Sequence, residues 1–464
     1  MFGYFFRMMT GQAATRKRLQ RHFAGRPLER IVTVARTFPI LSRVDVQLAV
    51  EAFFARREKP VLLGIHSAFE HETPTLTHLF TRGMVPVEIG PLQHDDVDVG
   101  DAAPVRCLRN GLWLAREGEL PFAVLLSPSV RHMAVGGIHL ELGVPEGERG
   151  LEFSQAFFRD LETQVNTGGT YRGRVISLER HEHYSGIPNA VKVHRLPPVR
   201  REEVILPAVT LALLDRNVVT FIRARDQIKR LGLSGRKGLL FYGPPGTGKT
   251  HTIHYLASQL PGHTTLLITA EQMGLLAEYF RLARFLQPSM LIMEDVDLVA
   301  RARERRSGPC DEVLLNQLLN EMDGLREDAD VMCILTTNRP DQLEPALASR
   351  PGRIDQAIEF PLPDDDGRSK LVTLYARGLE VSGELRALIV RRTKGASPAF
   401  IKELMRRAAQ FQFEAEADGK LRQSAVDGAL EEMVFSGGAL NLKLLGGSSA
   451  ELGAANEPRL TRLQ

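Results

Sequence analysis

The sequence predicts an α/β protein: a mainly parallel sheet with helices on both faces, preceded by an α+β domain and followed by a small helical lid. Two observations predict the sheet. Short apolar runs of strand type alternate with helical stretches, which is typical of parallel strands joined by crossover helices. A glycine-rich loop follows the first run, at the edge where such sheets hold ligands. The runs lie at residues 238–242, 265–269, 290–294, 331–336 and 356–360.

The composition is that of an ordinary globular protein. Of 464 residues, 43% are hydrophobic and 25% are charged, and this length favours two or three domains. The formal net charge of +3 is too small to indicate nucleic acid. Three widely spaced cysteines, Cys107, Cys310 and Cys333, suggest neither a disulfide framework nor a zinc site and fit a reducing cytoplasm. No apolar stretch approaches the length of a membrane span.

The region before residue 201 is predicted to be the α+β domain. Strands are expected at residues 111–116, 122–126 and 172–178. A helix is expected at residues 151–165, with its phenylalanines on one side. None of these elements indicates a task, and a substrate or adaptor platform is the favoured interpretation.

Two polar features of this region have alternatives. The first thirty residues are basic, and we interpret them as a solvated or flexible arm, with contact to nucleic acid or an acidic surface as the alternative. His181, Glu182 and His183 alternate as on a strand, but a metal site there lacks a third ligand.

The most informative motif is the octet at residues 243–250, which fits the phosphate-binding pattern G-x-x-x-x-G-K-[ST]. A strand-loop-helix turn directs backbone N–H groups and the positive end of the helix at one small volume. Lys249 is expected to reach the β- and γ-phosphates of ATP, and the Thr250 hydroxyl is expected to bind Mg²⁺. The residues expected to hold the nucleotide are Gly243, Pro244, Pro245, Gly246, Thr247, Gly248, Lys249, Thr250 and His251.

Polar side chains follow the strands further along the chain. The run at residues 290–293 ends in Glu294 and Asp295, and the run at residues 331–335 leads to Asn338. Glu294 is expected to hold Mg²⁺ through its water shell, and Asp295 to polarise the attacking water. Asn338 is expected to sit between the acids and the γ-phosphate and to orient that water.

Two arginines flank a turn near the end of this region. Pro351 and Gly352 force the turn between Arg350 and Arg353. Considered alone, both arginines fit surface charges better than functional groups, so their interpretation depends on the motifs that precede them.

Together these motifs resemble the AAA family of P-loop ATPases, from near Glu203 to near Phe435. The resemblance implies a ring, usually of six subunits, with ATP held between neighbours. It also implies that Asn338 is the sensor residue and that Arg350 and Arg353 are arginine fingers acting on the ATP of the adjacent subunit. The matching pieces are the octet, the acidic strand end, residues 316–325, residues 336–340 and residues 350–353.

The resemblance extends to the lid. Helices are expected at residues 368–379 and 384–393, and a third is expected to begin with Ser397 as N-cap and Pro398 at the first helical position. By resemblance to the family, Gly395 and Ala396 would pack near the nucleotide base, although Ser397 and Pro398 depart from the usual sequence there.

Two further departures from the family pattern bear on function. The two acids occur in the order Glu294 then Asp295. This order resembles the branch of the family that contains the mitochondrial translocase of a folded Rieske protein. ATP turnover could be slow, because the side chain of Asp295 is one methylene shorter than that of glutamate. A loop that grips polypeptide in many family members is reduced to Met273 and Gly274, and Met273 is at least as well explained as an ordinary apolar contact.

The predicted function is a cytoplasmic Mg²⁺-ATP-dependent ATPase that remodels, translocates or disassembles protein substrates as a homohexamer. A regulatory nucleotide switch with slow turnover and a remodeller associated with nucleic acid are the alternatives, the second motivated by the basic arm and by the arginines within residues 301–306. The predicted domains are residues 1–200 (substrate or adaptor domain), 201–363 (large ATPase subdomain), 364–436 (helical lid) and 437–464 (flexible tail).

Overall fold

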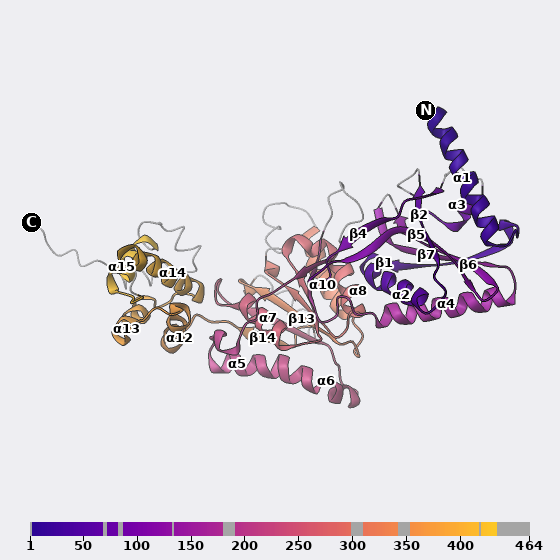
Figure 1. Cartoon of the computed structure of the whole chain (residues 1–464). Coiled ribbons are helices and arrows are strands. Elements are labelled where there is room, and N and C mark those ends of the chain that lie inside the picture. Colours follow the sequence, from indigo (N-terminus) through magenta and orange to yellow (C-terminus); the bar gives the residue numbers. More distant parts are fainter. Residues whose placement is uncertain are drawn as a thin grey trace, which may run out of the picture. The chain divides into compact units, whose positions relative to one another are not determined.

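The computed structural model describes residues 2–67, 72–81, 87–131, 134–179, 191–297, 310–341, 353–416 and 419–433. The chain forms two compact units (Figure 1): the first comprises Met1–Arg172 and Ile176–His194, and the second comprises Gly173–Val175 and Arg195–Gln464. Among the described helices, none combines the length and the apolarity that crossing a bilayer requires.

The first unit is built on an antiparallel sheet. Its strands follow the order β1-β7-β6-β5-β2-β3, and β4 pairs with β5. The strands predicted at residues 111–116 and 122–126 are confirmed within β5 and β6, and the one predicted at residues 172–178 is confirmed only for residues 175–178, which form β8, because residues 172–174 lie in a turn. The elements of this region are α1 (Phe2–His22), β1 (Ile31–Pro39), α2 (Arg43–Ala55), β2 (Val61–Ser67), α3 (Leu76–Phe80), β3 (Val87–Gly90), β4 (Gln93–Val97), β5 (Val105–Glu117), β6 (Leu120–Arg131), β7 (Ala134–Pro145), α4 (Glu148–Thr167), β8 (Val175–Leu178) and β9 (Val191–His194).

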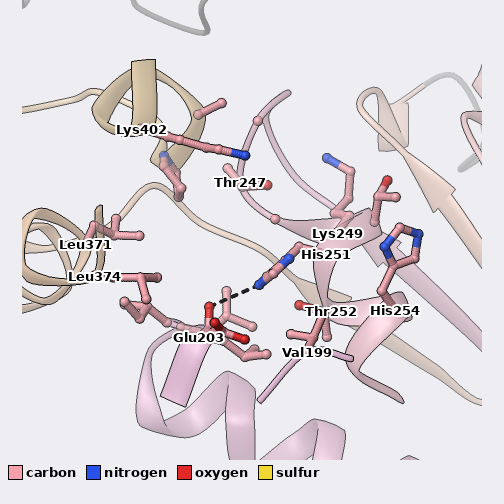
Figure 2. Close-up of a pocket in the computed structure, with 18 of the residues that line it drawn as sticks. Val199, Glu203, Thr247, Lys249, His251, Thr252, His254, Leu371, Leu374 and Lys402 are labelled. Carbon is pink, nitrogen blue, oxygen red and sulfur yellow. Dashed lines mark hydrogen bonds between the residues drawn. The ribbon is translucent and has the colours of Figure 1, made fainter. Parts of the chain in front are cut away.

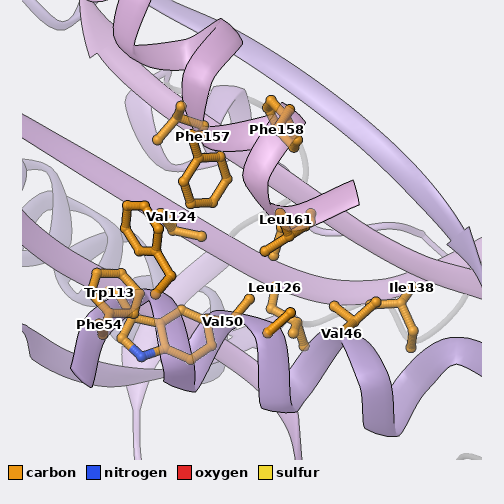
Figure 3. Close-up of a cluster of buried hydrophobic side chains, with 14 of the residues drawn as sticks. Val46, Val50, Phe54, Trp113, Val124, Leu126, Ile138, Phe157, Phe158 and Leu161 are labelled. Atoms are coloured by element: carbon orange, nitrogen blue, oxygen red, sulfur yellow. The ribbon is translucent and has the colours of Figure 1, made fainter. Parts of the chain in front are cut away.

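One face of this sheet is covered by α2 and α4, as Figure 3 shows. The predicted apolar side of α4 is confirmed, because Phe157, Phe158 and Leu161 are buried against the strands. Phe54 of α2 stacks on Trp113 of β5, with ring centroids 5.8 Å apart. Aromatic packing of this kind supplies much of the free energy that holds helices on a sheet.

The expectation of a flexible basic arm is wrong for the chain around α1. Residues 2–22 form this helix, and Leu19 and Phe23 are fully buried in a second apolar cluster with α3. Arg16 pairs with Glu29 at 2.7 Å. The charges misled the prediction because they occupy the solvated side of a helix whose sparse apolar residues are enough to hold it on the sheet.

The second unit contains the predicted parallel sheet. Five of its strands follow the order β14-β10-β13-β12-β11 and run parallel, which confirms all five strand predictions. The residues of β12 and β13 are buried on both faces, as expected for strands covered by helices on both sides. The strands are β10 (Lys237–Tyr242), β11 (Thr264–Ile268), β12 (Ser289–Met293), β13 (Val331–Thr337) and β14 (Gln356–Glu359).

The strand register positions the site. Tyr242 pairs with Thr337, and Ile268 pairs with Met293, so the carboxyl ends of four strands meet at one edge of the sheet. The phosphate loop, the two acids and Asn338 all follow strands at this edge. The helices of this part are α5 (Ala208–Leu214), α6 (Phe221–Arg230), α7 (Lys249–Gln259), α8 (Leu276–Phe285) and α10 (Cys310–Asp323).

The helical lid is also confirmed. Its apolar cluster joins four helices around Phe400, Ile401 and Leu404, which are fully buried. The Ser397 hydroxyl accepts a hydrogen bond from the N–H of Phe400 at 3.2 Å, as an N-cap does. The predicted flexible tail at residues 437–464 lies outside the described residues. The lid helices are α12 (Asp365–Ala376), α13 (Gly383–Arg392), α14 (Pro398–Ala415) and α15 (Gln423–Glu431).

Candidate nucleotide-binding site

The phosphate loop connects β10 to α7 and takes its shape from glycines. Gly246 and Gly248 have φ angles of 76° and 98°, in the region that side chains rarely adopt. A Cβ at Gly246 would lie 2.8 Å from the Cβ of Ala399, so the loop and the lid approach too closely for a side chain. Helix α7 begins at Lys249 and presents its positive end to the loop.

Lys249 is held in place by oxygen atoms of its own chain. Its Nζ donates to the carbonyl oxygens of Gly243 at 2.8 Å and Pro244 at 3.0 Å, and to Oδ1 of Asn338 at 2.8 Å. Burial lowers the pKa of Lys249 to about 8, against the opposing attraction of the nearby carboxylates. The geometry keeps the ammonium group pre-positioned for a phosphate.

Asn338 connects this lysine to the acidic strand end. The Asn338 amide donates from Nδ2 to Oδ1 of Asp295 at 3.0 Å. The N–H of Asp295 donates to the Thr336 hydroxyl at 2.9 Å, and Asp295 has a φ of 49°, uncommon for a residue with a side chain. A strained backbone held by neighbouring strands is typical of sites where a side chain must be aimed.

A second acid, Asp297, organises this edge, and the sequence did not reveal it. Its Oδ1 accepts from the Thr337 hydroxyl at 2.9 Å and from the N–H of Asn338 at 3.1 Å. Asp297 is 2% exposed, and its two hydrogen bonds hold the end of β13 and the backbone of Asn338 in place. The only available signal was its place two residues after Asp295, which also fits a surface turn.

The two neighbouring acids take different positions. Asp295 borders the cavity beside the phosphate loop, together with Thr250. Glu294 is not among the lining residues and lies near His254, whose pKa is lowered by burial and raised in part by the charge of Glu294. Because Mg²⁺ binds oxygen ligands and keeps several waters, the Thr250 hydroxyl at the cavity fits that ion, and the Asp295 carboxylate is left to face a water. The assignment of Glu294 to the metal stays a prediction.

The phosphate loop and Asp295 border a cavity of about 650 Å³. Its walls are the connector at residues 197–199 and 203–206, the loop with the first turns of α7, the strand ends at Asp295, Thr336 and Asn338, and the lid, several of whose side chains are drawn in Figure 2. The lid contributes apolar side chains and cations, which suits a ligand with a flat apolar part and an anionic part. Its lining residues are Leu371, Leu374, Tyr375, Arg377, Pro398, Ala399 and Lys402.

His251 ties two of these walls together. Its Nε2 lies 3.2 Å from the carbonyl oxygen of Glu203, as the dashed line in Figure 2 marks. A carbonyl oxygen only accepts, so Nε2 carries the proton and donates. Further along α7, the Ser258 hydroxyl donates to the carbonyl of Tyr255 at 2.7 Å and lies 3.4 Å from the carbonyl oxygen of Val199. The connector is therefore bound along the helix that begins at Lys249.

The predicted base-contacting pair in the lid lies beside the cavity and does not line it. Ala396 is fully buried in the lid, and neither Gly395 nor Ala396 is a lining residue. Pro398 and Ala399 take that place, and the N–H of Ala399 donates to the carbonyl of Gly246 at 3.1 Å. Pro398 and Ala399 line the cavity because they are the first residues of α14, which begins next to the phosphate loop.

The two candidate arginine fingers are Arg350 and Arg353. Arg350 lies outside the described residues. Arg353 is described and forms an ion pair with Asp323 of its own chain. The pair lies at the amino ends of β10 and β14, at the edge of the sheet opposite the phosphate loop.

Two further sequence predictions concern positions away from the cavity. Met273 is 3% exposed in a short 3₁₀ helix, Ala270–Leu275, which confirms an apolar contact there. His181, Glu182 and His183 lie outside the described residues. In the part of the chain that the structure describes, no three His, Cys, Asp or Glu side chains gather as a metal-binding cluster.

Comparison with known proteins finds one family match and several relatives. The family described as "ATPase family associated with various cellular activities (AAA)" matches residues 239–362. The 26S proteasome regulatory subunit S10B homolog B of Arabidopsis thaliana is 34% identical over 201 residues, covering 41% of this chain and 50% of its own length. The proteasome-activating nucleotidase of Methanothermobacter thermautotrophicus is 31% identical over 244 residues, covering 50% and 59%.

A third relative is the Cell division cycle protein 48 homolog of Archaeoglobus fulgidus, 33% identical over 198 residues, which cover 41% of this chain and 27% of that protein. The chain spans about half the length of the first curated relatives it matches. These matches, with the parallel sheet and the phosphate loop at its carboxyl edge, identify residues 239–362 as an AAA ATPase domain.

Proposed function

We propose that the chain is a Mg²⁺-dependent ATP hydrolase that remodels protein substrates as a ring of six copies. The observation that supports it most is the hydrogen-bonded series Lys249–Asn338–Asp295, which crosses three neighbouring strand ends beside the phosphate loop. A cation, a polar amide and a carboxylate in this order suit phosphate binding, water orientation and water activation.

Each group of the series has a distinct role. Lys249 binds the β- and γ-phosphates, and Asn338 is then free to orient the attacking water. Asp295 accepts a proton from that water, and the Thr250 hydroxyl and Glu294 hold the metal, which neutralises phosphate charge when bound. Pro245 to His251 supply the cradle with Gly243 and Pro244 behind it, and Arg350 of a neighbouring copy completes the charge neutralisation.

The assignment to protein substrates is supported by the relatives, whose names place them in proteasomal and Cdc48-type systems. Residues 1–200 serve as a substrate or adaptor domain, with 201–363 as the large ATPase subdomain and 364–436 as the lid, in a cytoplasmic setting. The order Glu294–Asp295 supports a place near the branch of the Rieske-protein translocase. Residues 197–199 and 203–206, in the connector that follows the first unit, line the cavity.

A regulatory switch with slow turnover is the second candidate. It is supported by Asp295, whose short carboxylate already accepts from Asn338 and is held at an unusual φ. A carboxylate engaged in this way reaches less far toward a water than a glutamate would. The remodelling ATPase and the regulatory switch would use the same cavity and differ only in the rate of ATP hydrolysis.

Three variants test the proposal. Asp295→Asn should bind ATP with nearly wild-type affinity and lose turnover by about a hundredfold or more. Lys249→Ala should lose both binding and turnover, and Asp328→Asn, at an exposed site, should lose neither. The ATP-bound Asp295→Asn protein should retain bound protein substrates, which identifies them. A wild type without affinity for Mg²⁺-adenine nucleotides refutes the proposal, and a wild type that binds but turns over no faster than Asp295→Asn favours the switch.

A further inference from the structure

Strand β1 (Ile31–Pro39) lies at one end of the sheet of the first unit, and among the described strands it pairs with β7 alone. All nine of its residues pair in one continuous register, without a bulge. Natural edge strands are usually short, bulged or charged, because these features prevent pairing with other chains. β1 is long and regular, and its one charged side chain, Arg36, already pairs with Glu162 of α4 at 2.9 Å.

The backbone groups of β1 alternate between the side that faces β7 and the side that faces away from it. A Cβ at Gly137 of β7 would lie 2.4 Å from the carbonyl oxygen of Phe38, so this carbonyl points toward β7. The even-numbered residues therefore bond to β7. Thr33, Ala35 and Thr37 direct their N–H and C=O groups away from it, and we call these groups the outward row.

The ends of the strand fit this alternation. Ile31 belongs to the same set as the outward row, and its N–H donates to the carbonyl of Leu28, outside the sheet. Pro39 and its counterpart Pro145, which pairs with Ile31, have no N–H to give. Both prolines stand at positions where the pairing of β1 with β7 needs no N–H, as expected for proline in a sheet.

The outward row has few partners. Within the part of the chain that the structure describes, no group accepts from the N–H of Thr33, Ala35 or Thr37, and only the carbonyl of Ala35 is bonded, to Nη1 of Arg36 at 3.0 Å. Ala35 and Thr37 are exposed, and Thr33 is half-buried. The free donors recur at every second residue, roughly 6.8 Å apart. Acceptors with that spacing are found along another extended backbone.

Apolar side chains lie at one end of this edge. Val32 of β1 is 45% exposed, and Leu151 in the first turn of α4 is 56% exposed. Helix α4 begins three residues after Pro145, the residue opposite Ile31, so both side chains belong to the same end of the sheet. A strand added to β1 would cover apolar surface there with apolar side chains of its own.

We propose that the outer edge of β1 binds an extended segment of a protein substrate as an added strand. The occupant is a polypeptide with apolar side chains at alternate positions, held by hydrogen bonds to the outward row. This inference rests on the proposed remodelling function and names the surface by which the first unit holds a substrate. A second copy of β1 is the competing occupant, but antiparallel pairing of two copies is two-fold symmetric, and neighbours in a cyclic ring are not related in that way.

A proline in the outward row tests the proposal. Ala35→Pro removes the central free N–H and leaves the hydrogen bonds between β1 and β7 in place. The probe is a fluorescent peptide of about ten residues, in which valine and threonine alternate between terminal lysines. Ala35→Pro should weaken its binding by about tenfold or more, and the matched control Ala35→Ser, which keeps the N–H, should bind within about twofold of the wild type. Equal binding by all three proteins would overturn the proposal.

Amide exchange at single-residue resolution tests the wild type itself, and it remains decisive if the proline variant does not fold. In the free chain, the outward amides should exchange about a hundredfold faster than the amides that bond to β7. The peptide should slow the outward amides by about tenfold or more and leave those of Val34 and Arg36 unchanged. Slow exchange of the outward amides without peptide would overturn the proposal: protection that grows with protein concentration assigns the edge to a second copy, and constant protection assigns it to another part of the chain.

ATP turnover separates this inference from the proposed function. Ala35 belongs to the first unit, and the residues that line the nucleotide cavity all belong to the second. Ala35→Pro should therefore keep basal turnover within about twofold of the wild type while it loses the peptide. If the wild type does not hydrolyse ATP, the proposed function fails, and the exchange experiment still decides whether β1 binds an extended chain.

Discussion

Lys249 and Asn338 stand 89 positions apart in the chain, and the ammonium group of the first donates a 2.8 Å hydrogen bond to the amide oxygen of the second. The other end of that amide donates to Asp295. Asn338 is therefore the only link in the described site that touches both the phosphate-binding cation and the candidate water-activating acid. A ligand that binds the Lys249 ammonium group in place of Asn338 would free the amide oxygen of Asn338 for another partner.

Replacing Asn338 should separate binding from turnover. In Asn338→Ala, Lys249 keeps two carbonyl partners, so ATP affinity should stay within about threefold of the wild type, while turnover should fall by about a hundredfold as Asp295 loses its partner. Equilibrium binding of a fluorescent ATP and steady-state hydrolysis measure the two effects. Asn217→Ala, which removes a hydrogen bond to Leu213 at 2.9 Å, is the control. An equal loss of both quantities would contradict the assigned role.

Nucleotide affinity should weaken in alkaline solution. The pKa of Lys249 is lowered to about 8, from a usual value near 10.5, and triphosphate bound beside it would raise that pKa again. Binding then takes up a proton above pH 8, so affinity should fall by up to about tenfold per pH unit. Calorimetry in two buffers of different ionisation enthalpy detects the proton. Lys249→Arg does not titrate in this range, and any affinity it retains should not decline.

The same shift has the opposite sign for folding without nucleotide. Between about pH 8 and 10.5 the unfolded chain binds more protons at Lys249 than the folded chain, so this residue's contribution to stability rises with pH across that window. The Lys249→Met variant should lack this contribution. The difference in unfolding free energy between wild type and variant, measured at pH 7.5 and 9.5, checks the sign.

Two glycines with similar backbones should respond differently to a methyl group. Gly246 and Gly232 have φ angles of 76° and 74°, but of the two only Gly246 has neighbours, Ala399 and Ser397, within 4 Å of the point that a Cβ would occupy. Gly232→Ala should cost about 1 kcal/mol of stability from backbone strain alone. Gly246→Ala should add a collision with the lid and reduce ATP affinity by about tenfold or more. Equal ATP affinity in the two variants would show that loop and lid are not closely apposed.

Two serine N-caps allow a similar comparison. Ser397 and Ser382 each accept a hydrogen bond at 3.2 Å, from Phe400 and Leu385 respectively. Their alanine variants should each lose about 1 kcal/mol of stability. Ser397→Ala should also weaken ATP binding, because Ser397 begins the helix whose Ala399 contacts the phosphate loop. Thermal unfolding with and without nucleotide separates the effects, and an effect of Ser382→Ala on binding would argue against a local cause.

Local sequence patterns determined much of this protein. Apolar runs set the five parallel strands, the pattern of α4 set its buried side, and Ser397 followed by Pro398 set the start of a lid helix. The phosphate loop, with its glycines and Lys249, was also predicted from the sequence. These features depend on neighbours within a few residues, where hydrogen bonding and side-chain period act directly.

Tertiary structure decided the rest, because it depends on distances between segments far apart in the chain. It bonded Asp297 to the backbone of Asn338, brought Pro398 and Ala399 to the wall of the cavity, and paired Arg353 with Asp323. Charged residues follow no period that reveals their partners. A carboxylate or guanidinium adopts its role from whichever counter-charge the folded backbone brings within reach, and the sequence alone does not contain that distance.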